Sequence, residues 1–271
     1  MKVWRLPETR PGSPTKSRLT VDGTPSSPSV APKALAGRNC VLGPLVDSTF
    51  TSVVSISDHE AVVGTESGTL CLLDDTDGSQ KFSVVHNLDF GVTSLAVDVD
   101  ESCLWVGGRG NRIRRFSLET LRTPVTPSRP TSSRSSAGGK VMEPAIACLG
   151  SLSSHIIAID STKAIHLCPT DALDQSDELT HMEKTLLGHT DSVLGVGPLK
   201  TPNPTGADFF TWSRGGMVNF LDTRGYCHSS RTIALDHLPD VDDESCNELR
   251  VVRSTDDMDF FLSGDKLGVL R

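Results

Sequence analysis

The sequence predicts an all-β fold made of tandem repeats, and three observations support this prediction. A pattern of fourteen residues occurs four times and then begins a fifth copy. Each copy has two short apolar runs around a turn of Gly, Ser or charged residues, which is typical of a β-hairpin. The copies start about 43 to 53 residues apart, which matches one four-stranded propeller blade with inserted loops.

Each copy is therefore a predicted hairpin. Val, Ile, Leu and Phe fill most of the apolar runs, and these residues favour strands that pack against a core. Gly or small polar residues separate the two runs, where the chain must reverse its direction. In chain order the copies read AVVGTESGTLCLLD at 61–74, LWVGGRGNRIRRFS at 104–117, IIAIDSTKAIHLCP at 156–169, FFTWSRGGMVNFLD at 209–222 and FLSGDKLGVLR at 261–271.

Three segments resemble the WD-repeat β-propeller family. SRGGMVNFLD at 213–222 looks like the third strand of a WD repeat, and LLGHTDSVLGV at 186–196 looks like the Gly-His loop before the next first strand. KVWRL at 2–6 fits the third-strand template, with Trp4 at the position of the family's Trp. The resemblance implies an all-β, WD-repeat-type β-propeller.

The sequence also departs from the family pattern at positions that affect the packing of the blades. Only one Gly-His pair, Gly188 and His189, is present, and the family pattern gives His189 a structural role in its loop. We therefore expect each blade to depend more on apolar packing than on the family's buried hydrogen-bond network. The residues at the Trp position of the later copies are Leu73, Phe116, Cys168 and Leu221.

The chain begins within one predicted third strand and ends within another. We therefore expect an incomplete propeller of about five blades, open at both ends. Two segments rich in Pro, Ser, Thr and Gly have too few apolar residues to offset the entropy of ordering, so they are predicted to be disordered insertions. The predicted organisation is the end of a blade at 1–6, an insertion at 7–38, blades at 39–122, a second insertion at 123–142 and blades at 143–271, with the last one truncated.

Both insertions are basic and contain proline-directed phosphorylation patterns. Residues 1–38 hold seven Lys or Arg against two acids, and residues 120–142 hold four with no acid. Ser13 and Thr126 stand in SPTK and TPSR, which resemble the full sites of cyclin-dependent kinases. Phosphorylation would make these segments neutral or negative and could switch a charge-driven contact. The alternative is that a basic linker rich in Ser and Pro contains such tetrapeptides by chance.

Composition narrows the function classes. The net charge is −8, and because the two insertions are basic, the remaining chain is strongly acidic and would repel nucleic acid. No apolar run approaches the roughly 18 residues that would indicate a membrane span. The seven cysteines are scattered without a C-x-x-C pair, which argues against a zinc site or a disulfide framework. A reducing cytoplasmic location fits best, with nuclear or cytoskeletal locations as alternatives.

Motifs for catalysis, metal binding or cofactor binding are absent from the sequence. GGRGNR at 107–112 lies in a strand-to-strand turn and does not open a helix, so it does not match a phosphate-binding loop. The acidic runs at 74–77 and 240–244 lack EF-hand spacing. The histidines are far apart, and no G-x-S-x-G elbow occurs. We therefore expect a protein that is not an enzyme and that has no cofactor and no metal.

One pattern becomes visible when the repeats are superimposed. Equivalent loops of successive blades lie on one face, so basic residues at one turn position would form an arc on that face. Such an arc would suit an acidic or phosphorylated peptide, because Arg holds these groups through paired hydrogen bonds. The alternative is that these basic residues have no binding role, because an exposed turn accepts any polar residue. The turn residues are Glu66, Arg109, Ser161, Arg214 and Lys266, with Lys163 two places further along the third copy.

The C-terminal third has a narrower resemblance. The segment 209–225 and ELRVVRSTDDMDFFLSGDKLGVLR at 248–271 look similar to the propellers of the mitogen-activated protein kinase-binding scaffold family. That resemblance implies a scaffold in kinase signalling or at the mitotic spindle. We predict a non-catalytic protein-interaction scaffold that uses Arg109, Lys163, Arg214 and Lys266 to bind partners. The alternative is a substrate-recognition subunit of a ubiquitin ligase or another enzyme complex that reads acidic or phosphorylated peptides.

Overall fold

Strands make up most of the part of the chain that this computed structural model describes, together with two short helices. The chain divides into two compact units, residues 1–46 and 47–271. The predicted phosphorylation sites Ser13 and Thr126 lie outside the described residues. These residues are 2–4, 37–39, 45–76, 80–98, 100, 102–122, 144–173, 184–200, 203, 205–235, 247–254 and 261–270.

The first unit contains one strand pair among its described residues. Strand β1 (Lys2–Trp4) lies where the sequence predicts a third strand, and it pairs in antiparallel fashion with β2 (Gly37–Asn39). Gly37 and Arg38 fall inside the predicted insertion, 7–38, but their backbones pair with β1. Strand β2 thus includes the last two residues of the predicted insertion.

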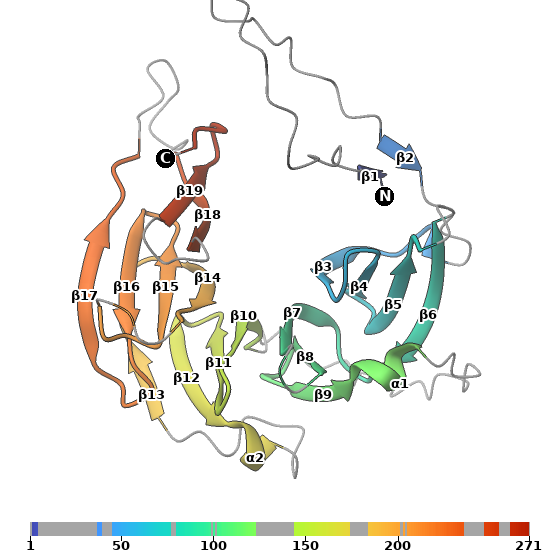
Figure 1. The fold of residues 1–271 in the computed structure, drawn as a ribbon, viewed down its shortest axis with the longest axis horizontal. Helices are drawn as coiled ribbons and strands as arrows, with labels where there is room; N and C mark the ends of the chain where they lie inside the picture. The colour runs from blue at the N-terminus through green and yellow to red at the C-terminus, as the bar shows by residue number, and fades with distance from the viewer. Residues whose placement is uncertain are drawn as a thin grey trace, which may run out of the picture. The chain divides into compact units, whose positions relative to one another are not determined.

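In its described part, the second unit contains five antiparallel sheets, each with its strands in chain order (Figure 1). The first sheet consists of β3 (Phe50–Ser55), β4 (Glu60–Thr65), β5 (Thr69–Asp74) and β6 (Lys81–Asn87). The second sheet has three described strands, β7 (Val92–Asp98), β8 (Cys103–Gly108) and β9 (Ile113–Ser117), and helix α1 (Leu118–Arg122) follows it.

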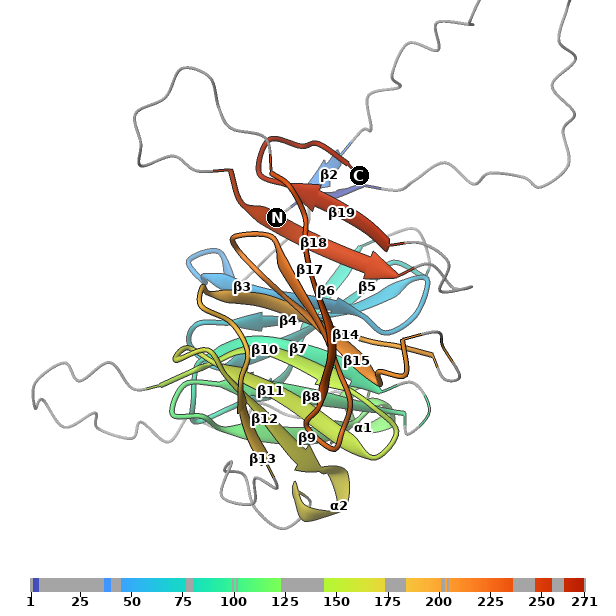
Figure 2. The same cartoon turned by 90° about the vertical axis from the view of Figure 1, so that its left-hand side faces the viewer.

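The third and fourth sheets have four strands each, and the fifth has two among the described residues (Figure 2). The third consists of β10 (Ile146–Ser151), β11 (His155–Asp160), β12 (Ala164–Pro169) and β13 (Lys184–Leu187), with helix α2 (Thr170–Leu173) after β12. The fourth consists of β14 (Val193–Pro198), β15 (Phe209–Ser213), β16 (Met217–Leu221) and β17 (Cys227–Thr232). The fifth consists of β18 (Leu249–Ser254) and β19 (Phe261–Asp265).

The hydrophobic core lies between successive sheets. Each of its four clusters draws on two neighbouring sheets, as where Ile157 and Ile165 of the third sheet pack with Phe209 of the fourth. Burying one such side chain fully contributes about 1.5–3 kcal/mol. The middle strands are covered on both faces, which explains why the sequence shows continuous apolar runs rather than alternation. The outer strand β17 is mostly exposed and polar.

The predicted hairpins are confirmed. The first four copies fold as the pairs β4 with β5, β8 with β9, β11 with β12 and β15 with β16. The fifth copy supplies β19 and the turn after it. The first strands β3, β7, β10, β14 and β18 follow one another on the inner side of the second unit (Figure 1). The molecule therefore has the blade architecture that the repeat spacing predicts.

Candidate functional site: the turn face

The five predicted turn residues occupy one equivalent position in the structure. Each follows the second strand of its sheet, and its backbone N–H donates to the carbonyl of the residue just before the first strand. This repeated hydrogen bond fixes the turns at the same end of every sheet, which we call the turn face. The five bonds are Glu66 to Thr49 at 2.9 Å, Arg109 to Gly91 at 3.1 Å, Ser161 to Ala145 at 2.8 Å, Arg214 to Ser192 at 2.9 Å and Lys266 to Glu248 at 2.8 Å.

Polar side chains cap several of these turns. Thr65 Oγ1 accepts the N–H of Thr69 at 2.8 Å, and Asp160 Oδ1 accepts the N–H of Thr162 at 2.8 Å. Asp265 Oδ1 accepts two backbone N–H groups, two and four residues further along, at 3.0 and 2.9 Å. These caps supply partners for turn amides that lack them within the strand ladder. The sequence carried a signal for them, a small polar residue directly before the turn position.

The Glu66–Arg109 pair joins the first two sheets on the turn face. Arg109 Nη2 contacts Glu66 Oε1, and about half of each side chain is exposed. One acid balances one base here, so the pair adds no net charge. A second contact close by involves Arg112, whose Nη1 lies 2.7 Å from Asp89 Oδ2 and whose guanidinium stacks over Phe90. Burial acts to raise the pKa of Asp89, but its hydrogen bonds and the neighbouring arginines hold that pKa below its usual value.

In the third sheet Lys163, not the turn residue Ser161, provides the cation. Its ammonium Nζ donates to the carbonyl of Thr190 at 2.8 Å, which links the third sheet to the loop before the fourth. Lys163 has a φ of 76°, in the left-handed region that favours glycine. The corresponding residues Gly68, Gly216 and Gly268 also have positive φ. Lys163 thus stands at the position that glycine takes in other copies.

The backbones of Arg214 and Lys266 bond to neighbouring residues, Leu249 and Glu248, at the boundary between the fourth and fifth sheets. There the structure adds two residues, Glu248 and Arg250, that the repeat pattern did not indicate. Glu248 Oε2 lies 2.8 Å from Arg250 Nη2, and Glu248 Oε1 lies 3.9 Å from Arg214 Nε. The arginine side chains are 53% and 50% exposed, whereas Glu248 is only 19% exposed. We call Arg214, Glu248, Arg250 and Lys266 the arginine–glutamate cluster.

Irregularities in the first strands explain why Arg250 lies here. Every first strand has a register shift after its first residue, so one residue is left without a partner in the second strand. Such a bulge redirects the side chain of the extra residue. The bulged residues are Thr51, Thr93, Ala147, Leu194 and Arg250.

The bulged residues act differently along the chain. Thr51 Oγ1 donates to the carbonyl of Val92 at 2.7 Å, and Thr93 Oγ1 donates to the carbonyl of Ile146 at 2.6 Å. Each bond ties a first strand to the first strand of the next sheet. Arg250 lines a cavity of about 300 Å³ between the first strands, which the bulged Thr93 also lines, and Arg250 and Arg253 bring positive charge to it. The bulged residue therefore bonds neighbouring sheets together in the first two sheets, whereas in the fifth sheet it contributes a positive charge.

Buried polar contacts inside the blades are structural. His189 Nε2 lies 2.7 Å from Thr211 Oγ1 and 3.3 Å from Asn219 Nδ2, and Asn219 Nδ2 donates to the carbonyl of Gly188 at 2.7 Å. Desolvation lowers the pKa of His189, although the nearby Asp191 opposes this shift. The fourth sheet thus keeps the loop role predicted for His189.

The third sheet contains a second buried histidine contact. His166 Nε2 lies 2.9 Å from Asp160 Oδ2, and both side chains are 6% exposed. His166 Nδ1 lies 3.2 Å from Thr185 Oγ1. Burial acts to raise the pKa of Asp160, but hydrogen bonds from Thr162, His166 and backbone amides outweigh it and lower that pKa. Asp160 also caps its turn, so this chain of contacts holds β11, β12 and β13 together.

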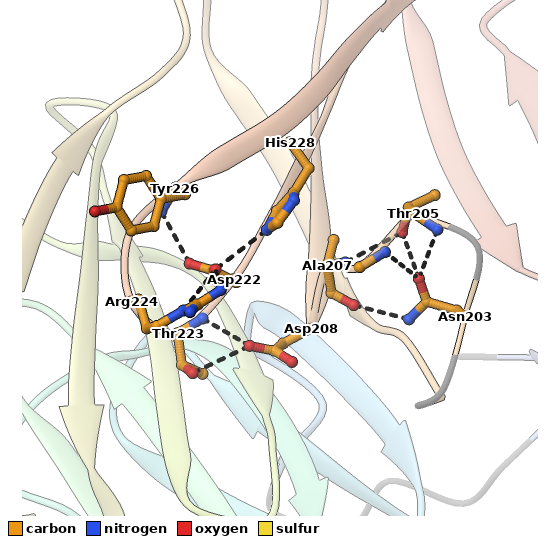
Figure 3. Close-up of polar contacts among 10 residues, drawn as sticks. Asn203, Thr205, Ala207, Asp208, Asp222, Thr223, Arg224, Tyr226 and His228 are labelled. Atoms are coloured by element: carbon orange, nitrogen blue, oxygen red, sulfur yellow. Dashed lines mark hydrogen bonds and ion pairs between the residues drawn. The ribbon is translucent and has the colours of Figure 1, made fainter.

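A larger pocket of about 560 Å³ lies at the opposite end of the strands, among the loops that follow β7, β10 and β14. Ser151 Oγ donates to Asp98 Oδ2 at 2.6 Å and so bridges the second and third sheets. Asp208 Oδ2 accepts the N–H of Thr223 at 2.8 Å (Figure 3). Beside it, the Asn203 side chain binds the backbone of its own loop through several hydrogen bonds (Figure 3). The polar groups in these contacts already bind one another.

Asp222 organises the turn after β16 on that side of the molecule (Figure 3). Its carboxylate accepts the N–H of Tyr226 at 2.9 Å and contacts Arg224 Nη2 at 2.9 Å and His228 Nε2 at 3.1 Å. Burial acts to raise the pKa of Asp222, yet these hydrogen bonds and the charge of Arg224 lower it to about 2. The carboxylate is 3% exposed, so it stabilises the turn rather than presenting a binding group.

The described part of the chain has few other features that could form a functional site. No group of three or more His, Cys, Asp and Glu within those residues has the proximity to hold a metal ion. No helix among the described residues is both long and apolar enough to span a bilayer. Cys71, Cys103 and Cys168 are buried, and burial raises the pKa of Cys71 and Cys168 to about 12. These thiols pack as small apolar groups, as predicted.

Comparisons with known proteins bear on the fold. The sequence matches no family model. It matches no curated protein either. Its structure is similar to the WD40 beta propeller domain of Doa1, with a TM-score of 0.54 and 16% sequence identity, over 83% of this chain and 64% of that one. At this identity the likeness concerns the fold alone, and it confirms the predicted propeller class. Because 951 chains of solved structures resemble this one, the fold does not select a partner.

Proposed function

We propose that this chain is a non-catalytic scaffold that binds other proteins through its turn face. The observation that carries the proposal is the repeated backbone bond that fixes five exposed turns at one end of the sheets. A rigid set of loops on a β-framework is a common basis for recognition. The partner-binding residues proposed are Arg109, Lys163, Arg214 and Lys266, and the partners are proteins with acidic or phosphorylated segments.

A more specific role follows from the resemblance of the C-terminal third to mitogen-activated protein kinase-binding scaffolds. It supports a function in kinase signalling or at the mitotic spindle, with phosphorylation at Ser13 and Thr126 modulating contacts. The proposal includes a cytoplasmic location, with the nucleus or cytoskeleton as alternatives, which the free cysteines support. Nucleic acid is not among the proposed partners, because the net charge is −8.

A second candidate is a substrate-recognition subunit of a ubiquitin ligase or another enzyme complex. The arginine–glutamate cluster favours it, because exposed arginines suit a phosphorylated peptide. Co-purifying proteins distinguish the two candidates. A recognition subunit should bring down a ligase core, whereas a scaffold should bring down kinases or cytoskeletal proteins.

Affinity purification with mass spectrometry tests the proposal. The full chain is compared with a triple variant, Arg109→Glu, Arg214→Glu and Lys266→Glu, and we expect the variant to lose a reproducible set of partners. The control, with two charge reversals away from the turn face, is Arg231→Glu with Lys81→Glu, on the outer strands β17 and β6. An unchanged partner set in a folded triple variant would show that the turn face is not the binding surface.

A further inference from the structure

The arginine–glutamate cluster is a place on the turn face where cations outnumber acids. Arg250 pairs with the carboxylate of Glu248, Arg214 lies 3.9 Å from it, and Lys266 bonds to Glu248 through its backbone N–H. Asp191, whose carboxylate lies beside Gly215, is the second acid near Arg214. In the Glu66–Arg109 pair one acid meets one base. The cluster therefore keeps positive charge on the surface of a chain whose net charge is −8.

Backbone hydrogen bonds hold the cluster in place. The N–H of Leu249 donates to the carbonyl of Arg214 at 2.9 Å, and the N–H of Lys266 donates to the carbonyl of Glu248 at 2.8 Å. Three loops of two sheets are thereby locked together. A prearranged site of this kind loses little entropy when it binds a ligand.

The arginines remain available to a ligand. Arg250 is 53% exposed and Arg214 is 50% exposed. Arg250 also lines the cavity between the first strands, where Arg253 adds a further cation. An anion held by the cluster would thus have a hollow with positive charge beside it.

We propose that this cluster binds the phosphate group of a phosphorylated serine or threonine in a partner protein. When no phosphate is bound, the carboxylate of Glu248 pairs with the arginines in its place. The inference rests on the proposed function, since it names the ligand class of the turn face. It also narrows the predicted site, because Arg109 lies outside the cluster. Arg250, which the sequence pattern missed, becomes one of the binding residues.

Charge explains why phosphate suits this site better than a carboxylate. Glu248 already supplies one carboxylate to both arginines, so an Asp or Glu of a partner would only exchange one carboxylate for another and would add no interaction. A phosphomonoester carries about 1.5 to 2 negative charges at pH 7 and three acceptor oxygens. It can bind two guanidinium groups at once through charge-assisted hydrogen bonds. Extended nucleic acid would meet repulsion from the acidic body.

Fluorescence anisotropy with a degenerate peptide library tests the inference. The library has a central phosphothreonine, and parallel libraries carry Thr or Glu at that position. We expect the full chain to bind the phosphorylated library at least about tenfold more tightly than either parallel library. Arg250→Ala should weaken this binding about tenfold, whereas Glu248→Gln should tighten it about threefold or more.

Arg231→Ala is the matched control, because it removes an exposed arginine on the outer strand β17, outside the proposed binding residues, and should change affinity less than about twofold. Equal binding of the Glu library, or no effect of Arg250→Ala, would overturn the inference. Equally tight binding of a single-stranded oligonucleotide would show a general polyanion surface and would also overturn it. If partner capture depends on the turn face but not on phosphorylation, the proposed function stands and this inference fails.

Discussion

The Glu66–Arg109 pair and the arginine–glutamate cluster occupy the same repeat positions on the turn face but differ in their balance of charge. In the first, one acid meets one base between the first and second sheets. In the second, two arginines share one carboxylate between the fourth and fifth sheets. The difference shows that a basic residue at a repeated turn position does not define a binding site. Beside the first pair, however, Arg112 and Arg114 also share a single carboxylate, that of Asp89, so the contrast concerns the turn positions themselves.

The two boundaries also differ in how the sheets are held together. At the first, the bulged Thr51 bonds to the next first strand, and Gly68 packs against backbone carbonyls of the following loop. At the last, the bulge carries Arg250, while the turn glycine of the fourth sheet, Gly216, packs as Gly68 does, with an added Cβ 2.5 Å from the Ile233 carbonyl oxygen. The two boundaries therefore differ in their bulged residue, which is a bonding threonine at the first and an exposed arginine at the last.

Replacing the turn glycines of the first and fifth sheets should give the largest difference in stability. At Gly68 (φ 90°) an added Cβ would lie 2.5 Å from the Phe90 carbonyl oxygen and 2.7 Å from that of Leu88, and backbone cannot move aside easily. We expect Gly68→Ala to lower the free energy of unfolding by about 3 kcal/mol or more. Gly268→Ala meets only the strain of its φ of 79°, which costs about 1 kcal/mol.

Denaturant unfolding followed by tryptophan fluorescence measures both values. Equal losses at Gly68 and Gly268 would contradict the difference in packing between these two turns.

Replacing the bulged residues gives a smaller effect. Thr51→Val keeps the shape of the side chain but removes the hydrogen bond to Val92, and we expect a loss of about 1 to 2 kcal/mol. Arg250→Ala should change stability by less than about 0.5 kcal/mol, because the side chain is exposed. The same unfolding measurement applies. A cost for Arg250→Ala as large as that for Thr51→Val would assign the arginine a structural role.

The repeated hairpins could be predicted from sequence because apolar runs and turn residues recur at nearly constant spacing. The turn residues could be aligned for the same reason, and the structure does place them at one equivalent position. Charge balance could not be predicted, because Glu248 lies before a first strand, in a region that the hairpin repeat does not cover. Arg250 was missed because a bulge is a property of strand pairing and leaves no fixed pattern in residue types.

Substitutions at Lys163 should have a small effect on stability. This residue lies between the two boundaries, and it combines a side-chain hydrogen bond with a strained backbone. Its ammonium bonds to the Thr190 carbonyl, while its φ of 76° suits glycine. Lys163→Ala should be destabilising, since it keeps the strain and loses the bond. Lys163→Gly removes both, so the glycine variant should be more stable than the alanine variant by about 1 kcal/mol in the unfolding assay. If alanine and glycine are equivalent, backbone strain does not matter at this turn, and its cation acts only through the bond to the neighbouring sheet.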